Sequence, residues 1–205
     1  MMNERKLYIE EWFPTQISCT NADDLLPLAV KMFDVTDMSS YKTDKYDNGY
    51  TSYFSNNSMP DIPEVEEFKK ELIDVCTLFA EHQGVDLENN HLKVDEIWMN
   101  YMKRNGTHVP HIHAESHYSG TFYINGPEGV GKIRFYSPIR QYWDFCNPPI
   151  LKSAEGNRES CAYMEHVPAP GELVMWNSWL RHEVMSHQSD EPRLSISFNI
   201  YAYPN

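Results

Sequence analysis

The sequence predicts a mainly β protein, in which short strands form a barrel or jelly roll and helices from the N-terminal part cover it. Two observations carry this prediction. Residues 1–90 contain the clearest helical periodicity, and after about residue 91 the chain changes to eight short runs of strand-forming residues separated by Gly and Pro turns. Short strands in this number are typical of a barrel or jelly roll. Because no repeat or low-complexity linker divides the chain, we expect a single domain over 1–205, with a helical cover over 1–90 and a β core over 91–205.

The helical cover is predicted from two segments that are separated by a long loop. A short helix is expected over Asp24–Phe33. A longer helix begins at Pro63 and stops before Gly84, because its apolar residues repeat every three or four positions and form one stripe: Val65, Phe68, Leu72, Val75 and Phe79. Residues 34–60 are predicted to be a loop with a short strand at 50–54. A loop of this length is often functional, for example as a flap over a cleft.

The β core is expected to contain eight strands. Their predicted positions are residues 94–102, 108–114, 119–125, 131–136, 161–167, 172–176, 181–186 and 193–203. The segment Tyr142–Pro149 is predicted to be a loop that shapes a substrate entrance, because loops carry specificity on a β scaffold. A free edge of an antiparallel sheet can pair with a second copy, which allows a homodimer.

Composition excludes several classes of partner. The formal net charge of -13 makes nucleic acids and acidic membrane surfaces poor partners, and no apolar run approaches the length of a membrane span. Acidic residues interrupt the apolar stretch near the N-terminus, so no signal-peptide core is predicted. We therefore expect a cytoplasmic protein whose four separated cysteines are reduced thiols: Cys19, Cys76, Cys146 and Cys161.

A cluster of histidines in residues 108–115 indicates a metal site. His111, His113 and Glu115 alternate, so an extended segment would present all three on one face. Two imidazoles and a carboxylate on one face can hold part of a metal site. A distal ligand is expected from His182, which follows an apolar strand and a short loop. His108 has odd spacing to His111 and is expected on the opposite face.

The strand at residues 193–203 has one polar and one apolar face. Its polar positions are Arg193, Ser195, Ser197 and Asn199, and they alternate with Leu194, Ile196 and Phe198. The apolar face must pack in the core. An inner face that carries Arg is unusual for a barrel unless an anion binds inside it.

Taken in order, these motifs resemble the iron(II)- and 2-oxoglutarate-dependent oxygenases, and in particular a prolyl-4-hydroxylase-like group of microbial and phage oxygenases. The resemblance covers roughly residues 95–203. It rests on the following motifs: His111-Ile-His113, Ser119-Gly-Thr-Phe-Tyr123, Pro170-Gly-Glu-Leu173, His182, and Arg193-Leu-Ser-Ile-Ser-Phe-Asn199. It implies that the core is a double-stranded β-helix of the jelly-roll or cupin-like kind, backed by the N-terminal helices.

The resemblance also implies residue roles. Iron(II) would be held by His111, His113 and His182. Arg193 would pair with the C5 carboxylate of 2-oxoglutarate, with Ser195 hydrogen-bonding beside it. The remaining cosubstrate contacts would come from Tyr101, Tyr123 and Asn199. The reaction implied is hydroxylation of a C–H bond in a peptide or small-molecule substrate, with O2 and 2-oxoglutarate converted to succinate and CO2.

One departure from the family pattern leaves alternatives open. Position 113 is His where the common pattern has Asp. The ligands are therefore either His111, His113 and His182 or His113, Glu115 and His182, and the spacing of the two tyrosines favours the first set. Two other functions remain: a cupin-like three-His metal dioxygenase that does not use 2-oxoglutarate, and a non-catalytic metal-binding structural protein.

Overall fold

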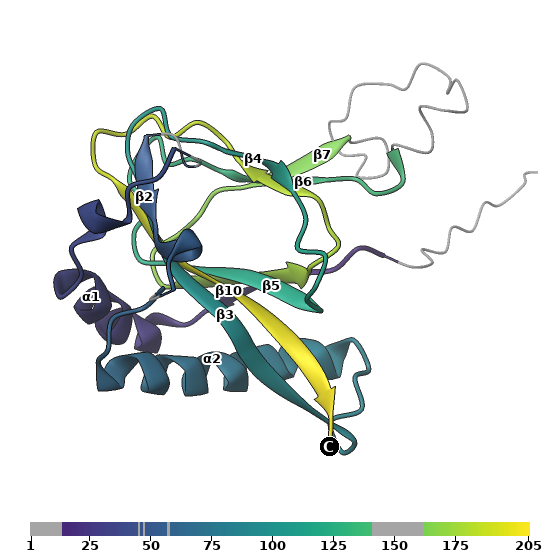
Figure 1. The fold of residues 1–205 in the computed structure, drawn as a ribbon. Coiled ribbons are helices and arrows are strands. Elements are labelled where there is room, and N and C mark those ends of the chain that lie inside the picture. Colours follow the sequence, from purple (N-terminus) through teal and green to yellow (C-terminus); the bar gives the residue numbers. More distant parts are fainter. Residues whose placement is uncertain (1–13, 45, 47, 57, 141–161) are drawn as a thin grey trace, which may run out of the picture.

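The fold, seen in a computed structural model, consists of two antiparallel sheets with helices against one of them (Figure 1). The structure describes residues 14–140, apart from 45, 47 and 57, and residues 162–205. The large sheet has the strand order β1 (Ile17–Asn21), β8 (Glu172–Asn177), β5 (Tyr118–Tyr123), β10 (Arg193–Pro204), β3 (Asn90–Met102) and β2 (Gly49–Thr51). The small sheet has the order β4 (His108–His111), β9 (His182–Val184), β6 (Ile133–Tyr136) and β7 (Tyr163–His166).

The chain alternates between the two sheets, which is the arrangement expected of a jelly roll. From β3 to β6 each strand lies in the sheet opposite its predecessor, and the same alternation resumes from β7 to β10. The interior between the sheets is therefore lined by strands that are far apart in sequence.

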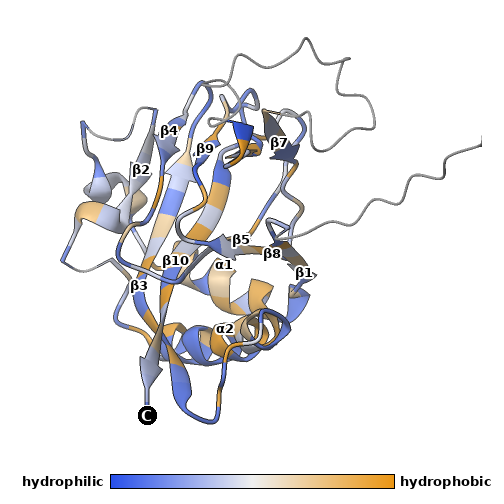
Figure 2. Ribbon diagram, turned by 90° about the vertical axis from the view of Figure 1, so that its right-hand side faces the viewer, coloured by the Kyte–Doolittle hydropathy of each residue, from blue (hydrophilic) through white to orange (hydrophobic). Residues whose placement is uncertain are grey.

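The helices pack on the outer face of the large sheet. They are α1 (Leu26–Asp34) and α2 (Pro63–His82), with short 3-10 turns at Asp23–Leu25, Met38–Tyr41 and Ser52–Phe54. The buried stripe of α2 meets the apolar face of the sheet, where the Phe68 and Phe122 rings lie 5.6 Å apart. Ile196 and Phe198 of β10 are fully buried in the same core. This confirms the apolar face predicted for that strand, and Figure 2 shows the alternation along β3 and β10.

A second and smaller core lies between the sheets. It contains Tyr123, Ile133, Phe135, Val174, Trp176 and Leu180. The polar face of β10 also turns toward this space, where Arg193, Ser195 and Asn199 are buried. The inter-sheet space is thus partly apolar packing and partly polar, and a polar interior of this kind suits a binding site better than a structural core.

Most predicted elements form close to their predicted positions. The helix at Pro63 ends at His82, and Gly84 follows it with a φ of 79°. The eight core strands agree to within a few residues, except that the predicted strand 108–114 stops at His111 because Ala114 and Glu115 form a turn. The predicted entrance loop Tyr142–Pro149 lies outside the described residues. Within the described part of the chain, no helix is both long and apolar enough to span a membrane.

Candidate metal centre and its cavity

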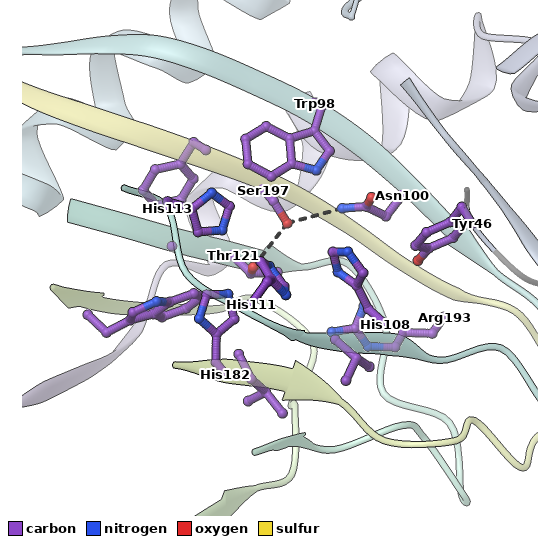
Figure 3. Close-up of a pocket in the computed structure, with 15 residues that line it drawn as sticks. Tyr46, Trp98, Asn100, His108, His111, His113, Thr121, His182, Arg193 and Ser197 are labelled. Atoms are coloured by element: carbon purple, nitrogen blue, oxygen red, sulfur yellow. Dashed lines mark hydrogen bonds between the residues drawn. The ribbon is translucent and has the colours of Figure 1, made fainter. Parts of the chain in front are cut away.

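A cavity lies between the two sheets. Its walls come from β3, β5, β8 and β10 on the large sheet and from β4, β6 and β9 on the small sheet. Figure 3 shows three imidazoles at one end of the cavity and Tyr46 with Arg193 at the other, with His108 between them. The cavity therefore has two chemically different ends.

Three histidines converge at the first end. His111 closes β4 and His182 opens β9, and the two residues are directly paired across these strands. Their ring centroids are 4.3 Å apart, and His113 lies 5.0 and 5.3 Å from them. Nitrogen atoms of the three rings lie within 4.8 Å of one another, which is close enough for one ion to contact all three.

Backbone carbonyls orient two of the three rings. His111 Nδ1 lies 2.8 Å from the Val109 carbonyl oxygen, and His182 Nδ1 lies 2.9 Å from that of Leu180. A carbonyl can only accept a hydrogen bond, so each Nδ1 must carry the proton. The lone pair is thereby left on Nε2 of both rings, as a metal ligand requires.

The third ring has a different partner. Asn199 is buried, and its Nδ2 lies 3.3 Å from His113 Nδ1 while donating a hydrogen bond to Glu96. Its Oδ1 accepts from Ser119 Oγ at 2.8 Å. The residue expected to face the cosubstrate therefore contacts His113 instead.

Burial keeps the imidazoles neutral. It lowers the pKa of His113 to about 4 and that of His182 well below its ordinary value, and the neighbouring His111 contributes to both shifts. The pKa of His111 is also lowered by burial. Neutral rings are the form that binds metal, so the site needs no deprotonation near neutral pH.

Glu115 does not join the cluster. It lies in the turn after β4 with an exposed side chain, and its carboxylate is outside the group of converging ligand atoms. The predicted alternation stops with the strand at His111, so Glu115 does not continue the face of His111 and His113. The geometry favours the three-His set over the set that contains Glu115.

Arg193 dominates the opposite end of the cavity. Its side chain is 3% exposed, its Nη1 donates to Ser195 Oγ at 3.1 Å, and its guanidinium lies 4.9 Å from the centre of the Tyr123 ring. Its Nε has no hydrogen-bond partner, and no ion pair to Arg193 occurs among the residues that the structure describes. A buried cation without a counter-charge is costly, so an anion is expected there.

The cavity floor offers no competing anion. Asn100 Nδ2 donates to Ser197 Oγ at 3.0 Å, and Thr121 Oγ1 lies 3.0 Å from the same oxygen. Asn100 Oδ1 accepts from Thr51 Oγ1 at 2.8 Å. These neutral groups satisfy one another. The buried side-chain atoms left without a partner near the cavity are Arg193 Nε, the Tyr123 hydroxyl and Trp176 Nε1, and of these only the guanidinium is charged.

The two tyrosines predicted to contact the cosubstrate take different positions. Tyr123 is fully buried beside Arg193, its hydroxyl has no partner, and burial raises its pKa to about 12. Tyr101 does not line the cavity, contrary to what its predicted contact with the cosubstrate requires. It lies on the other face of β3 and packs against Tyr50, with ring centroids 5.6 Å apart. Trp98 and Asn100 line the cavity, so alternation along β3 turns Tyr101 away from it.

Two residues that line the cavity are not predicted from the sequence. His108, expected on the opposite face, lines the cavity with its ring 4.2 Å from that of His111, because the β4–β9 register shifts between these residues. Pro110 within the strand is the signal that could have indicated this irregularity, since proline favours bulges. Tyr46 is buried in the same wall, 5.8 Å from the His108 ring. Burial lowers the pKa of His108 to about 3 and raises that of Tyr46 to about 12.

The rim beside His113 is aromatic and acidic. The Trp98 ring lies 5.9 Å from His113 and 4.8 Å from Tyr53, which is 42% exposed. Burial raises the pKa of Tyr53, and the carboxylates of Glu96 and Glu115 raise it further. The rim therefore presents ring faces and negative charge next to the three imidazoles.

Comparison with known proteins agrees with this geometry. The family model described as "Putative 2OG-Fe(II) oxygenase" matches residues 96–199, which run from within β3 to within β10 and include every residue that lines the cavity except Tyr46. Among curated protein sequences, no relative matches this chain.

Solved structures share the fold. A Pseudomonas putida prolyl-4-hydroxylase has a TM-score of 0.58 at 12% identity, covering 93% of this chain and 94% of that one. HygX from Streptomyces hygroscopicus, with nickel, 2-oxoglutarate and hygromycin B bound, has a TM-score of 0.58 at 11% identity, covering 91% and 83%. A 2OG-Fe(II) oxygenase family oxidoreductase from Burkholderia pseudomallei has a TM-score of 0.52 at 14% identity, covering 70% of this chain and 60% of that one.

These likenesses establish the fold. The core is a double-stranded β-helix, as the motifs predicted. This chain matches a little more than half the length of the Burkholderia protein. Identities of 10–14% leave reaction and substrate to be argued from the residues of the cavity.

Proposed function

The chain belongs to the 2OG-Fe(II) oxygenase family, whose cofactor is iron(II) and whose cosubstrate is 2-oxoglutarate, and on this premise we propose that it hydroxylates a C–H bond of a peptide or small molecule. O2 and 2-oxoglutarate would be converted to succinate and CO2. One observation carries the proposal: three convergent imidazoles lie across one cavity from a buried Arg193, which has no ion pair within the described part of the chain. A guanidinium in this position is suited to the far carboxylate of 2-oxoglutarate, which a three-His dioxygenase without that cosubstrate does not need to bind.

The donor set fits iron(II). His111, His113 and His182 would hold the ion through three neutral nitrogens, and imidazole is a common ligand for iron. Two of the rings already direct Nε2 away from their backbone carbonyls. For His113 to bind in the same way, its Nδ1 must carry the proton. Its contact with Asn199 Nδ2, which is itself a donor held by Glu96, would then have to lengthen.

The other end of the cavity fits the dianionic cosubstrate. Arg193 would pair with the far carboxylate of 2-oxoglutarate, because a planar guanidinium with a free Nε offers parallel donors to a carboxylate. Ser195 orients the guanidinium through its hydrogen bond. His108 and Tyr46 flank the path between Arg193 and the imidazoles, so we propose that they also contact 2-oxoglutarate.

The chain's residues then have defined tasks. When bound, iron and 2-oxoglutarate supply the oxidising power for O2 chemistry. Trp176, Ile133 and Val184 give the cavity an apolar wall that limits water near the imidazoles. The neutral imidazoles bind the ion, and Arg193 holds the cosubstrate in one orientation. No residue is assigned as a general base, since the hydroxylation does not require one.

The residues at the rim of the cavity indicate the chemical class of the substrate. Structural neighbours include a prolyl hydroxylase in complex with a hypoxia inducible factor peptide fragment and HygX with hygromycin B, so the fold accommodates both kinds of ligand. In this chain the rim at Trp98 and Tyr53 carries Glu96 and Glu115. Ring faces and carboxylates together favour a substrate that has a positively charged group.

Turnover without substrate tests the proposal. Purified protein given iron(II), ascorbate and 2-oxoglutarate should form succinate slowly, and His182→Ala should abolish this. His91→Ala is the matched control, because His91 is exposed and remote from the cavity, and it should leave succinate formation unchanged. Absence of succinate together with absence of a 2-oxoglutarate-dependent rise in Tm would refute the proposal.

A further inference from the structure

A second group of metal-ligating side chains lies outside the cavity. Cys19 comes from β1, His166 is the last residue of β7, and Glu172 is the first residue of β8. β1 and β8 are neighbours in the large sheet, whereas β7 is the edge strand of the small sheet (Figure 2). The cluster therefore bridges the two sheets where β7 meets β8 and β1.

The spacing of the three side chains suits a small divalent ion. Cys19 Sγ lies 4.0 Å from His166 Nδ1, and His166 Nε2 lies 2.8 Å from Glu172 Oε2. Potential ligand atoms of all three residues lie within 4.8 Å of one another. A tetrahedral zinc ion, with bonds of about 2.3 Å to sulfur and about 2.0 Å to nitrogen, holds such ligands roughly 3.5 Å apart. The thiol lies beside Nδ1 of the His166 ring and the carboxylate beside Nε2, so one ion can bind only one of these nitrogens. Closing the site would therefore need side-chain movements of about one ångström.

The charges of the cluster also suit such an ion. A thiolate and a carboxylate carry two negative charges, and with one neutral imidazole they balance a 2+ ion. Without metal, burial raises the pKa of the Cys19 thiol, and the Glu172 carboxylate raises it further. Glu172 Oε2 is held by the Ala169 amide, which donates to it at 3.1 Å, so the carboxylate stays beside the thiol.

The ligand types of this cluster suit zinc. Thiolate with imidazole is a preferred zinc donor set, whereas the cavity group contains nitrogen donors alone. We propose that Cys19, His166 and Glu172 form a second metal site that binds zinc, with water as a fourth ligand. This inference does not rest on the function proposed for the cavity.

The site would fasten a weakly packed strand. β7 has only four residues, three of them exposed, and among the strands that the structure describes it pairs with β6 alone. Few buried contacts hold such a strand, so a metal link to β1 and β8 would contribute much of its local stability. Binding of zinc should accordingly raise the Tm of the protein.

Cobalt(II) titration under reducing conditions distinguishes this site from the cavity. Bound at the cysteine, cobalt gives a thiolate-to-metal charge-transfer band in the near ultraviolet, which an all-imidazole site cannot give. The full-length protein should show this band and lose it on addition of zinc. His182→Ala should keep the band, because His182 belongs to the other group. Cys19→Ser should abolish it and raise the zinc Kd more than about tenfold.

The variants also identify the outcomes that would overturn the proposal. Cys19 is exposed, so Cys19→Ser should fold normally, which circular dichroism checks. His166→Ala should also lose or strongly weaken the band, because the proposal makes its imidazole a ligand. A band of unchanged intensity in His166→Ala contradicts that role. A wild-type protein without a charge-transfer band contradicts the proposal, and so does a band that persists in Cys19→Ser, because that band would belong to another thiol. A zinc-dependent rise in Tm that is equal in wild type and Cys19→Ser also contradicts it.

Discussion

Arg193 illustrates how a single residue specifies the ligand of the cavity. It is the one lysine or arginine that is buried among the described residues, and its Nε has no partner. The imidazoles at the other end are neutral because burial lowers their pKa. Under the proposed function, the cavity therefore suits a molecule that chelates the metal at one end and carries a carboxylate at the other.

Replacing Arg193 by Lys separates charge from geometry. Arg193→Lys keeps the positive charge but loses the planar fork, so the Kd of 2-oxoglutarate should rise about tenfold or more. Calorimetric titration of the nickel-loaded protein measures this. Arg104→Lys, at an exposed ion pair with Asp190, is the matched control. An unchanged Kd in Arg193→Lys would show that the guanidinium does not bind the cosubstrate.

His108 and Tyr46 should affect cosubstrate and metal differently. Each would contribute about one hydrogen bond to 2-oxoglutarate, so His108→Ala and Tyr46→Phe should each raise its Kd roughly three- to tenfold. The Kd of the metal should change less than about twofold, since neither residue belongs to the convergent group. Loss of metal binding in His108→Ala would instead identify His108 as a metal ligand. Its assignment as a contact of 2-oxoglutarate would then be wrong.

Elements position these residues through packing at a distance from the cavity. The stripe of α2 presses on the apolar face of β5 and β10, and the polar face of the same strands lines the cavity. Side chains of the adjacent strands need a small residue on β5. At Gly120 a Cβ would collide with the Phe198 ring of β10 and with Met175 of β8. The glycine of the Ser-Gly motif is thus explained by packing between adjacent strands rather than by chemistry.

Two leucines on α2 test this packing. Leu72→Ala removes a fully buried side chain and should lower the free energy of unfolding by about 2–5 kcal/mol. Leu78→Ala, on the same helix but 64% exposed, should change it by less than about 0.5 kcal/mol. Urea denaturation measures both variants. Equal changes in the free energy of unfolding would mean that burial of the apolar stripe does not hold α2 against the sheet.

At the scale of the whole molecule, buried neutral histidines link stability to pH. In the metal-free protein, the pKa values of His108 and His113 are about 3 and about 4, whereas unfolded histidine titrates near about 6.5. Below about pH 6.5 the unfolded chain therefore binds more protons than the folded one. The histidine contribution is complete above that pH and is lost as the pH falls toward 4.

Urea denaturation of the metal-free protein between pH 7.5 and 4.5 checks this linkage. The free energy of unfolding should fall steadily over the range, and His108→Asn should flatten the decrease. His91→Asn replaces an exposed histidine and should leave the slope unchanged. An identical slope in wild type and His108→Asn would show that His108 titrates alike in the folded and unfolded states.

Local patterns were enough to predict the elements of this protein. Alternation and turn residues located the eight core strands, and the spacing of apolar residues located α2, because these patterns depend on neighbours along the chain. The same alternation identified the buried polar face that carries Arg193. The order of the motifs indicated the family, which the family model then matched over residues 96–199.

The tertiary structure decided what faces the cavity. A register shift in β4 turned His108 inward, the loop before β2 contributed Tyr46, and the end of β4 left Glu115 on a turn. Cys19, His166 and Glu172 meet only because two sheet edges come together. The direction of Tyr101, by contrast, follows from the local alternation of β3, which turns it away from the face of Trp98 and Asn100. Side-chain direction within a regular strand is a local property and can be predicted from sequence. Bulges, strand ends and contacts between sheets depend on pairing across long distances in the chain, so the fold alone determines them.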